Sequence, residues 1–289
     1  MSTQQAAYLP PQLIQKLKQE WIKESKDKKK WDIKLSSNDF KITKSFKQAF
    51  DNVCKDGYSN VESIDLTLVG LQESQYEQIA GGFYSFKHMS QLKVDVANFT
   101  LLNYNIFLLP NLKQLNLTLG TSGYGESFLD GLSLALQQMK LLESFTLQVG
   151  ESGLVGQFCQ NLGQSILYLK NLYQFSLSIL SFNRFQEQYF EILSRYFQQH
   201  NQIQAISLHL KYCNSYQMDL NENKNKIILN INSSDSILSA KTEFEYGANL
   251  NFSQVNVRKS EVQKILVFKK SMAAQLFNNQ AMILTDLFY

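Results

Sequence analysis

The chain of 289 residues repeats one short pattern of apolar positions six times. In each copy, apolar residues stand at relative positions one, four and six, and the alternation continues to position eight. The copies begin 28, 23, 30, 30 and 31 residues apart, a periodicity that is typical of a solenoid. The six sets at positions one, four and six are Val61, Ile64 and Leu66; Met89, Leu92 and Val94; Leu112, Leu115 and Leu117; Leu142, Phe145 and Leu147; Leu172, Phe175 and Leu177; and Ile203, Ile206 and Leu208.

The alternation within each copy predicts a β-strand, because successive side chains of a strand point to opposite faces. Helical spacing between the strands predicts helices near 72–86, 126–139, 152–167 and 184–200. The third unit is short and has room only for a short helix or a turn. A strand and a helix that recur at a fixed period predict an α/β fold, in which a curved parallel sheet has helices on its convex side.

The N-terminal region departs from the repeat. Residues 9–29 have helical spacing and end in lysines, which favour a helix C-terminus. Residues 31–35 alternate as a strand does, and Ile33 precedes Ile64 by 31 residues, so we predict an early, degenerate repeat strand. Residues 40–53 show a helical pattern again. We therefore predict a basic amphipathic helix in 1–30 and a cap with a degenerate repeat in 31–60.

The C-terminal region is also irregular, as expected for a segment that closes an exposed apolar stack. After the repeat region, 61–211, we predict a further strand at 227–231, a hairpin within 244–252, a last strand at 265–267 and an amphipathic helix at 271–288. Residues 212–289 are therefore interpreted as degenerate repeats with a cap helix. The ends of the solenoid should be irregular helical and β caps.

The spacing of Val61, Ile64 and Leu66 and of its copies resembles the core of leucine-rich repeat proteins. Periods of about 28–31 residues with a helix in each unit look most like the ribonuclease-inhibitor-like subfamily, and the resemblance covers 61–211. That family usually has Asn or Cys at relative position nine, where this chain has Val69, Ala97, Gly120, Gly150, Leu180 and Lys211. The turns must therefore satisfy their backbone groups in another way. The resemblance implies a ligand-binding or scaffolding role rather than an activity.

The cysteines and the apolar runs of the chain indicate where in the cell the protein is located. Cys54, Cys159 and Cys213 lie far apart without CxxC spacing, which favours reduced thiols in an intracellular protein. No apolar run approaches the roughly 18 residues of a transmembrane helix, and the N-terminus lacks a secretory signal pattern. We expect a cytoplasmic protein. Association with cytoskeletal or ciliary structures and a mitochondrial location are the alternatives. The abundance of Asn and Gln with only three prolines is ciliate-like.

The candidate chemistry is sparse. Two glycine-containing loops at 120–127 and 150–156 lie between a strand and a helix, but neither matches GxGxxG or a phosphate loop with its lysine. His88, His200 and His209 form no HExxH or Cys/His cluster, and no GxSxG is present. We predict no catalytic residue, cofactor or metal site. The lysine-rich segment 23–30 is interpreted as a solvated helix end, with an acidic partner, RNA or an anionic membrane as alternatives.

The outward strand positions are the principal candidate for partner binding. They are polar, mostly small and nearly uncharged, which suits a broad hydrogen-bonding groove. The predicted residues on this face are Asp65, Thr67, Lys93, Asp95, Asn116, Thr118, Thr146, Gln148, Ser176, Ser178, Ser207 and His209. A solvated strand face without a partner is the alternative. The aromatic termini are the second candidate, through Trp21, Trp31, Phe277, Phe288 and Tyr289.

We therefore expect a non-enzymatic scaffold or structural subunit within a stable multiprotein complex. Its partners should be other proteins; the sequence indicates no nucleic acid as main ligand, no transmembrane segment and no small-molecule substrate. The alternative is a transient recognition module, for example a ubiquitin-ligase-type substrate adaptor, because residues 8–14 faintly resemble the start of an F-box. An enzyme would need clustered titratable residues, which the outward strand positions do not offer.

Overall fold

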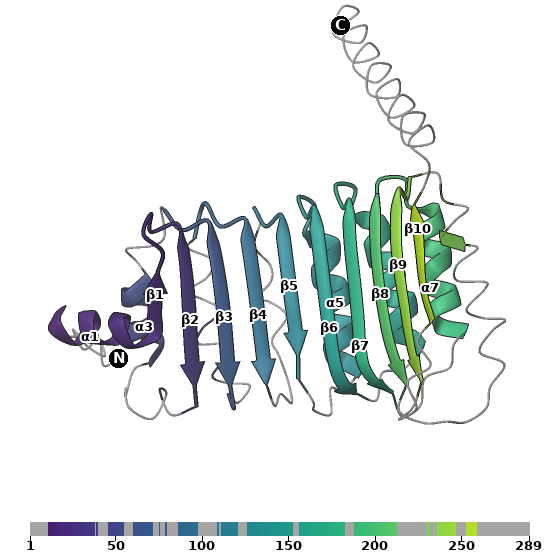
Figure 1. The fold of residues 1–289 in the computed structure, drawn as a ribbon. Helices are drawn as coiled ribbons and strands as arrows, with labels where there is room; N and C mark the ends of the chain where they lie inside the picture. The colour runs from purple at the N-terminus through teal and green to yellow at the C-terminus, as the bar shows by residue number, and fades with distance from the viewer. Residues whose placement is uncertain are drawn as a thin grey trace, which may run out of the picture.

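One ten-stranded sheet organises the chain, and its strands lie side by side in sequence order (Figure 1). The computed structural model describes residues 11–37, 39, 46–54, 60–71, 75, 79, 86–97, 109, 111–120, 126–152, 156–182, 188–212, 230–231, 234, 236–246 and 253–258. The strands are β1 (Ile22–Glu24), β2 (Lys30–Ser36), β3 (Ser63–Val69), β4 (Gln91–Ala97), β5 (Gln114–Leu119), β6 (Ser144–Ser152), β7 (Gln174–Phe182), β8 (Ala205–Tyr212), β9 (Ser239–Tyr246) and β10 (Ser253–Arg258). The helices are α1 (Pro11–Trp21), α3 (Phe46–Cys54), α5 (Glu126–Gln138), α6 (Gly156–Tyr168) and α7 (Gln188–Gln199).

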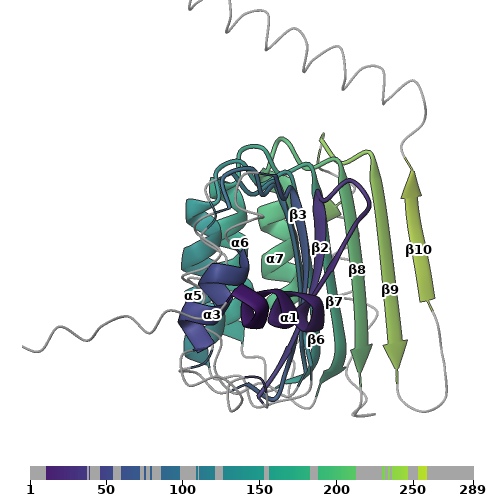
Figure 2. The same cartoon turned by 90° about the vertical axis from the view of Figure 1, so that its left-hand side faces the viewer.

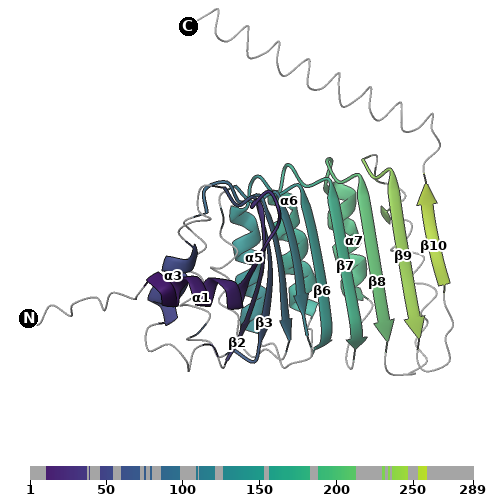
Figure 3. The same ribbon diagram turned by 60° about the vertical axis from the view of Figure 1, so that its left-hand side comes forward.

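The sheet is parallel from β2 to β9, and only its two outermost pairs are antiparallel. Parallel neighbours need a crossover connection, and α5, α6 and α7 lie in three of these connections. The crossovers place α3, α5, α6 and α7 on one face of the sheet, while no helix among the described residues covers the opposite face of β4–β9 (Figures 2 and 3). The predicted α/β class with a mostly parallel sheet is confirmed.

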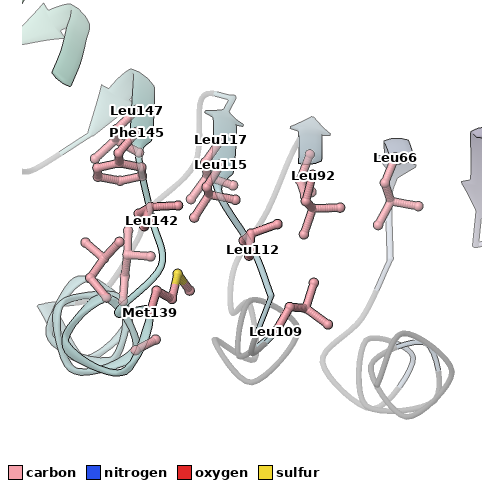
Figure 4. Packing of buried hydrophobic residues seen from close by; sticks show 14 of the residues in the cluster. Leu66, Leu92, Leu109, Leu112, Leu115, Leu117, Met139, Leu142, Phe145 and Leu147 are labelled. Atoms are coloured by element: carbon pink, nitrogen blue, oxygen red, sulfur yellow. The ribbon is translucent and has the colours of Figure 1, made fainter. Parts of the chain in front are cut away.

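The core lies between the sheet and these helices, and the repeated apolar positions fill it (Figure 4). Strand β3 shows the alternation directly, since Ile64, Leu66 and Leu68 are buried and the residues between them are not. In register, Leu66 stands beside Val94, which stands beside Leu117, so equivalent residues of successive units touch. Burying each such side chain stabilises the fold by about 1.5–3 kcal/mol.

Small side chains allow the helices to pack closely. A Cβ placed on Gly163 in α6 would lie 2.1 Å from Cδ2 of Tyr196 in α7, so the tyrosine ring rests on the helix backbone. The hydroxyl of the buried Ser165 can donate to two backbone carbonyl oxygens. Its Oγ lies 2.7 Å from the oxygen of Ser133 in α5 and 2.8 Å from that of Asn161. The hydroxyl thereby avoids the cost of burying an unpaired polar group.

One backbone arrangement links the start of each parallel strand to the unit before it. The amides of Glu62 and Ser63 both donate to the carbonyl of Lys29, at 2.8 and 3.1 Å. The same pair of bonds recurs at the start of every strand from β4 to β9, with the carbonyls of Glu62, Ser90, Lys113, Glu143, Tyr173 and Gln204 as acceptors. These bonds hold the loops before the strands next to one another.

The structure corrects three expectations at the N-terminal end. The helix predicted over 9–29 ends at Trp21, and the lysine-rich segment forms the turn of a hairpin between β1 and β2. Asp27 stabilises this turn by accepting bonds from Ser25 Oγ at 2.6 Å and Lys29 N at 3.1 Å, while Lys28 has a φ of 59°. Ser and Asp favour such turns over a helix interior. The register of β2 is also shifted by two residues, because Trp31, not Ile33, stands beside Ile64.

The C-terminal strands differ from their predicted positions as well. Ile231 is helical, so the strand predicted at 227–231 does not include it, and residues 227–229 lie outside the described part. The next parallel strand is instead β9, which pairs with β8 and then turns back into β10. A hairpin is therefore present, but its second strand begins at Ser253. The strand predicted at 265–267 and the helix predicted at 271–288 lie outside the described residues.

Candidate binding surface on the exposed sheet face

The twelve strand residues predicted to bind a partner lie in two rows on the sheet face opposite α5, α6 and α7. Each residue is directly beside its equivalent on the next strand, so the rows follow from the parallel register. All twelve are partly or fully exposed, as predicted. Row A contains Asp32, Asp65, Lys93, Asn116, Thr146, Ser176, Ser207 and Lys241; row B contains Lys34, Thr67, Asp95, Thr118, Gln148, Ser178 and His209.

The β1–β4 end of this face is charged. Lys30 at the start of β2 forms ion pairs with Asp65 on β3 at 2.8 Å and with Asp32 at 3.7 Å. Its hydrogen bond to Asp65, together with the charge of that carboxylate, raises the pKa of Lys30. Lys34 and Lys93 are exposed nearby, and no carboxylate among the described residues forms an ion pair with either. Strand β2 also belongs to this face, although none of its residues was among the predicted binding positions; the alternation of residues 31–35 was a signal for it.

A shallow hollow of about 390 Å³ lies at this charged end, where the C-terminal turn of α1 meets the sheet. Cationic and anionic side chains line it together, so it suits a polar or zwitterionic group better than an apolar one. The polar lining includes Gln19, Glu20, Lys23, Lys34, Thr67 and Lys93.

From β5 to β8, the two rows contain no Asp, Glu, Lys or Arg. Asn116 and Gln148 offer amide donors and acceptors, and the neighbouring Thr and Ser side chains offer hydroxyls. Because these side chains are short, an extended backbone could approach the sheet closely. The arrangement can bind by hydrogen bonding, but it contains none of the Trp, Tyr and Arg that commonly anchor tight interfaces.

The predicted docking role of the two tryptophans is wrong. Trp21 and Trp31 are only 3% and 1% exposed, because they close the N-terminal end of the core. Trp21 donates Nε1–H to Asp39 at 3.1 Å and packs on Phe50, and Trp31 meets Phe86 edge to face with ring centroids 5.8 Å apart. The other three predicted terminal residues, Phe277, Phe288 and Tyr289, lie outside the described residues.

Of the cysteines and histidines that the structure describes, Cys54, Cys159 and His200 are buried, whereas His88 is exposed and His209 is partly exposed. Burial raises the pKa of the Cys159 thiol to about 12, and burial together with the charge of Asp51 raises that of Cys54, so both thiols stay protonated. His200 is buried and bonded on both ring nitrogens. Across the described ranges, no three His, Cys, Asp or Glu residues gather in a way that could hold a metal ion. Cys213 and the central parts of the two glycine-containing loops, 121–125 and 153–155, fall outside those ranges.

Comparison with known proteins found no protein-family model and no curated protein that matches this chain. Of the helices that the structure describes, none combines the length and the apolar character needed to cross a lipid bilayer.

Proposed function

We propose that the chain is a leucine-rich repeat solenoid that acts as a non-enzymatic scaffold or structural subunit of an intracellular multiprotein assembly. The observation that supports this proposal is the pair of polar rows across β2–β8, which lie on the sheet face opposite α5, α6 and α7. With strands about 4.8 Å apart, the rows offer roughly 29 Å of continuous hydrogen-bonding surface. That length suits an extended protein segment that runs across the strands.

The two parts of the face have different roles in this proposal. The uncharged β5–β8 part hydrogen-bonds to the segment, and its lack of side-chain bulk lets the segment lie close. The charged β1–β4 part, with Lys34 and Lys93 beside the hollow, orients the segment through ionic contacts. Charge complementarity of this kind contributes more to specificity than to affinity.

The test replaces Thr146 and Ser176, which are neighbours across β6 and β7, by arginine in the tagged full-length protein. The control variant has Gln164→Arg and Gln198→Arg, which add the same charge on exposed helix positions. Proteins that co-purify from the native cell are quantified for both variants. We expect recovery of partners to fall roughly tenfold for the T146R/S176R variant only, because two long side chains would hold the segment off the sheet.

Equal recovery of the same partners with the face variant would contradict the proposal, as would a purified protein that is monodisperse with no partner. Partners recovered well below one copy per chain, and exchanging within minutes, would instead favour the transient recognition module.

A further inference from the structure

The loops that precede the parallel strands form one basic rim along the upper edge of the sheet in Figure 1. Residues more than a hundred positions apart are brought together there, because β2–β8 all begin at the same edge. The described residues of the rim include seven lysines and three acids, a net charge of +4. Its charged residues are Lys26, Asp27, Lys28, Lys29, Glu62, Lys87, Lys113, Lys140, Glu143 and Lys170.

Two of the rim's acids are already neutralised within it. Lys29 Nζ lies 2.7 Å from Glu62 Oε1, and Lys113 Nζ lies 2.9 Å from Glu143 Oε1. These hydrogen bonds raise the pKa of both lysines. The excess positive charge therefore belongs to the remaining lysines, none of which has an ion-pair partner among the described residues. Because Lys29 and Lys113 hold their own carboxylates, Glu62 and Glu143 do not oppose an incoming anion strongly.

Asparagine side chains fix the backbone of the loops that carry three of the remaining lysines. Asn111 Nδ2 donates to the carbonyl of Lys87 at 2.9 Å, and Asn171 Nδ2 donates to that of Lys140 at 2.8 Å. Lys170 directly precedes Asn171. The three lysines thus stand on loops bonded to their neighbours, and from β4 to β7 the rim extends about 14 Å at one strand spacing per unit.

Exposed apolar side chains lie on the same rim. Leu141, Tyr168 and Tyr173 are 44%, 60% and 40% exposed, and they are three of the five large hydrophobic residues exposed in the described part. Leu141 directly follows Lys140, and Tyr168 stands two residues before Lys170. The hydrogen bond from Asn171 to Lys140 connects the two loops. Tyrosine beside cationic groups is typical of protein interfaces.

We propose that this basic rim is a docking surface for an acidic protein segment that carries apolar side chains. Charge complementarity requires an acidic partner, and the exposed leucine selects a protein over a nucleic acid, which has no aliphatic surface to match it. The rim also contains no arginine, the residue best suited to bidentate phosphate recognition. The inference concerns a surface separate from the two polar rows and does not depend on the function proposed for them.

The test uses fluorescence anisotropy with the full-length protein and a labelled twelve-residue peptide of repeating Glu-Glu-Leu at low salt. The rim variant has Lys140→Gln and Lys170→Gln; the matched control has Lys16→Gln and Arg195→Gln, the same charge change at exposed helix positions that belong to neither surface. A third variant, Lys34→Gln and Lys93→Gln, measures peptide binding to the sheet face. We expect the rim variant to bind roughly tenfold more weakly and the control within about twofold of the wild type. The difference should nearly vanish at high salt, since exposed charges are screened.

A second pair of measurements tests the apolar part. The variant with Leu141→Ser and Tyr168→Ser should lose roughly fivefold in affinity for the Glu-Glu-Leu peptide but almost none for a Glu-Glu-Ser peptide. The proposal is overturned if the peptide does not bind, if the rim and control variants lose affinity equally, or if a twelve-residue oligouridine binds the rim more tightly than the peptide. A loss of affinity confined to the Lys34→Gln and Lys93→Gln variant would reject the rim while leaving the function proposed for the rows intact.

Discussion

The interior and the N-terminal end of the described core are stabilised in different ways. In the α5–α7 region, each unit packs on a similar unit through aromatic contacts: the Phe175 ring lies 5.9 Å from that of Phe145 and 5.0 Å from that of Phe197. At the α1–β2 end, where no further parallel unit follows among the described residues, two tryptophans cover the core together with polar groups such as Asp39. A repeat can be stabilised by its neighbour, whereas an end needs bulky side chains and specific hydrogen bonds.

The strongest way to break the interior pattern is Phe175→Ala. The ring is fully buried between two others, so its loss leaves a cavity that neighbouring units cannot fill. We expect the free energy of unfolding to fall by about 3–5 kcal/mol. Urea unfolding followed by circular dichroism measures this change. A loss below about 1.5 kcal/mol would mean that the interior units relax around the cavity and are not tightly packed.

A second variant tests the close approach of α6 and α7. Gly163→Val places side-chain atoms where the Tyr196 ring lies, so we expect a loss of about 1–3 kcal/mol in unfolding free energy. Adding Tyr196→Ala to this variant should recover part of the loss, because it removes the atoms that clash. If the double variant is destabilised by the sum of the two single effects, the helices are not in the contact described.

At the N-terminal end, the two tryptophans offer a matched pair. Trp21→Phe removes a hydrogen bond to the Asp39 carboxylate, whereas the Trp31 indole nitrogen is buried without a partner among the described residues. We expect Trp21→Phe to cost about 1–2 kcal/mol more in unfolding free energy than Trp31→Phe. The comparison uses thermal and urea unfolding of both variants. Equal losses would show that the bond to Asp39 adds no net stability.

The smallest effect concerns pH and the bonded His200. Its Nε2–H donates to Leu169 O at 3.1 Å, and its Nδ1 accepts from the amides of Gln202 and Ile203, so burial and the bonds to Nδ1 favour the neutral ring. Burial lowers the pKa of His200 below its ordinary 6.5. The unfolded chain therefore binds the proton first, and stability falls as the pH drops below about 6.5. His200→Gln should reduce the loss in unfolding free energy between pH 7.5 and 5; an unchanged pH dependence would assign it to other groups.

Local periodicity was sufficient to predict strands β3–β8 and their faces. Residues such as Thr146 and Ser176 alternate with buried neighbours, and the same position within successive repeats pairs across the parallel strands, so the rows could be predicted residue by residue. The exact register failed at Ile33, where the unit length differs from the repeat. The end of the first helix failed for another reason: Ser25 and Asp27 stabilise a turn through side-chain bonds, which apolar spacing does not reveal.

The sequence by itself determined the repeating core and the polar face, because both follow from the alternation of side chains along a strand. Only the tertiary structure decided the environment of residues between the repeats. Trp21 and Trp31 look like terminal aromatics in the sequence, but stacking on α3 and β3 buries them. Lys87, Lys140 and Lys170 are isolated charges in the sequence, and parallel strands that begin at one edge place them on a common rim. Which residues of different units become neighbours depends on how the units stack in space. The order of residues within one unit does not contain that information.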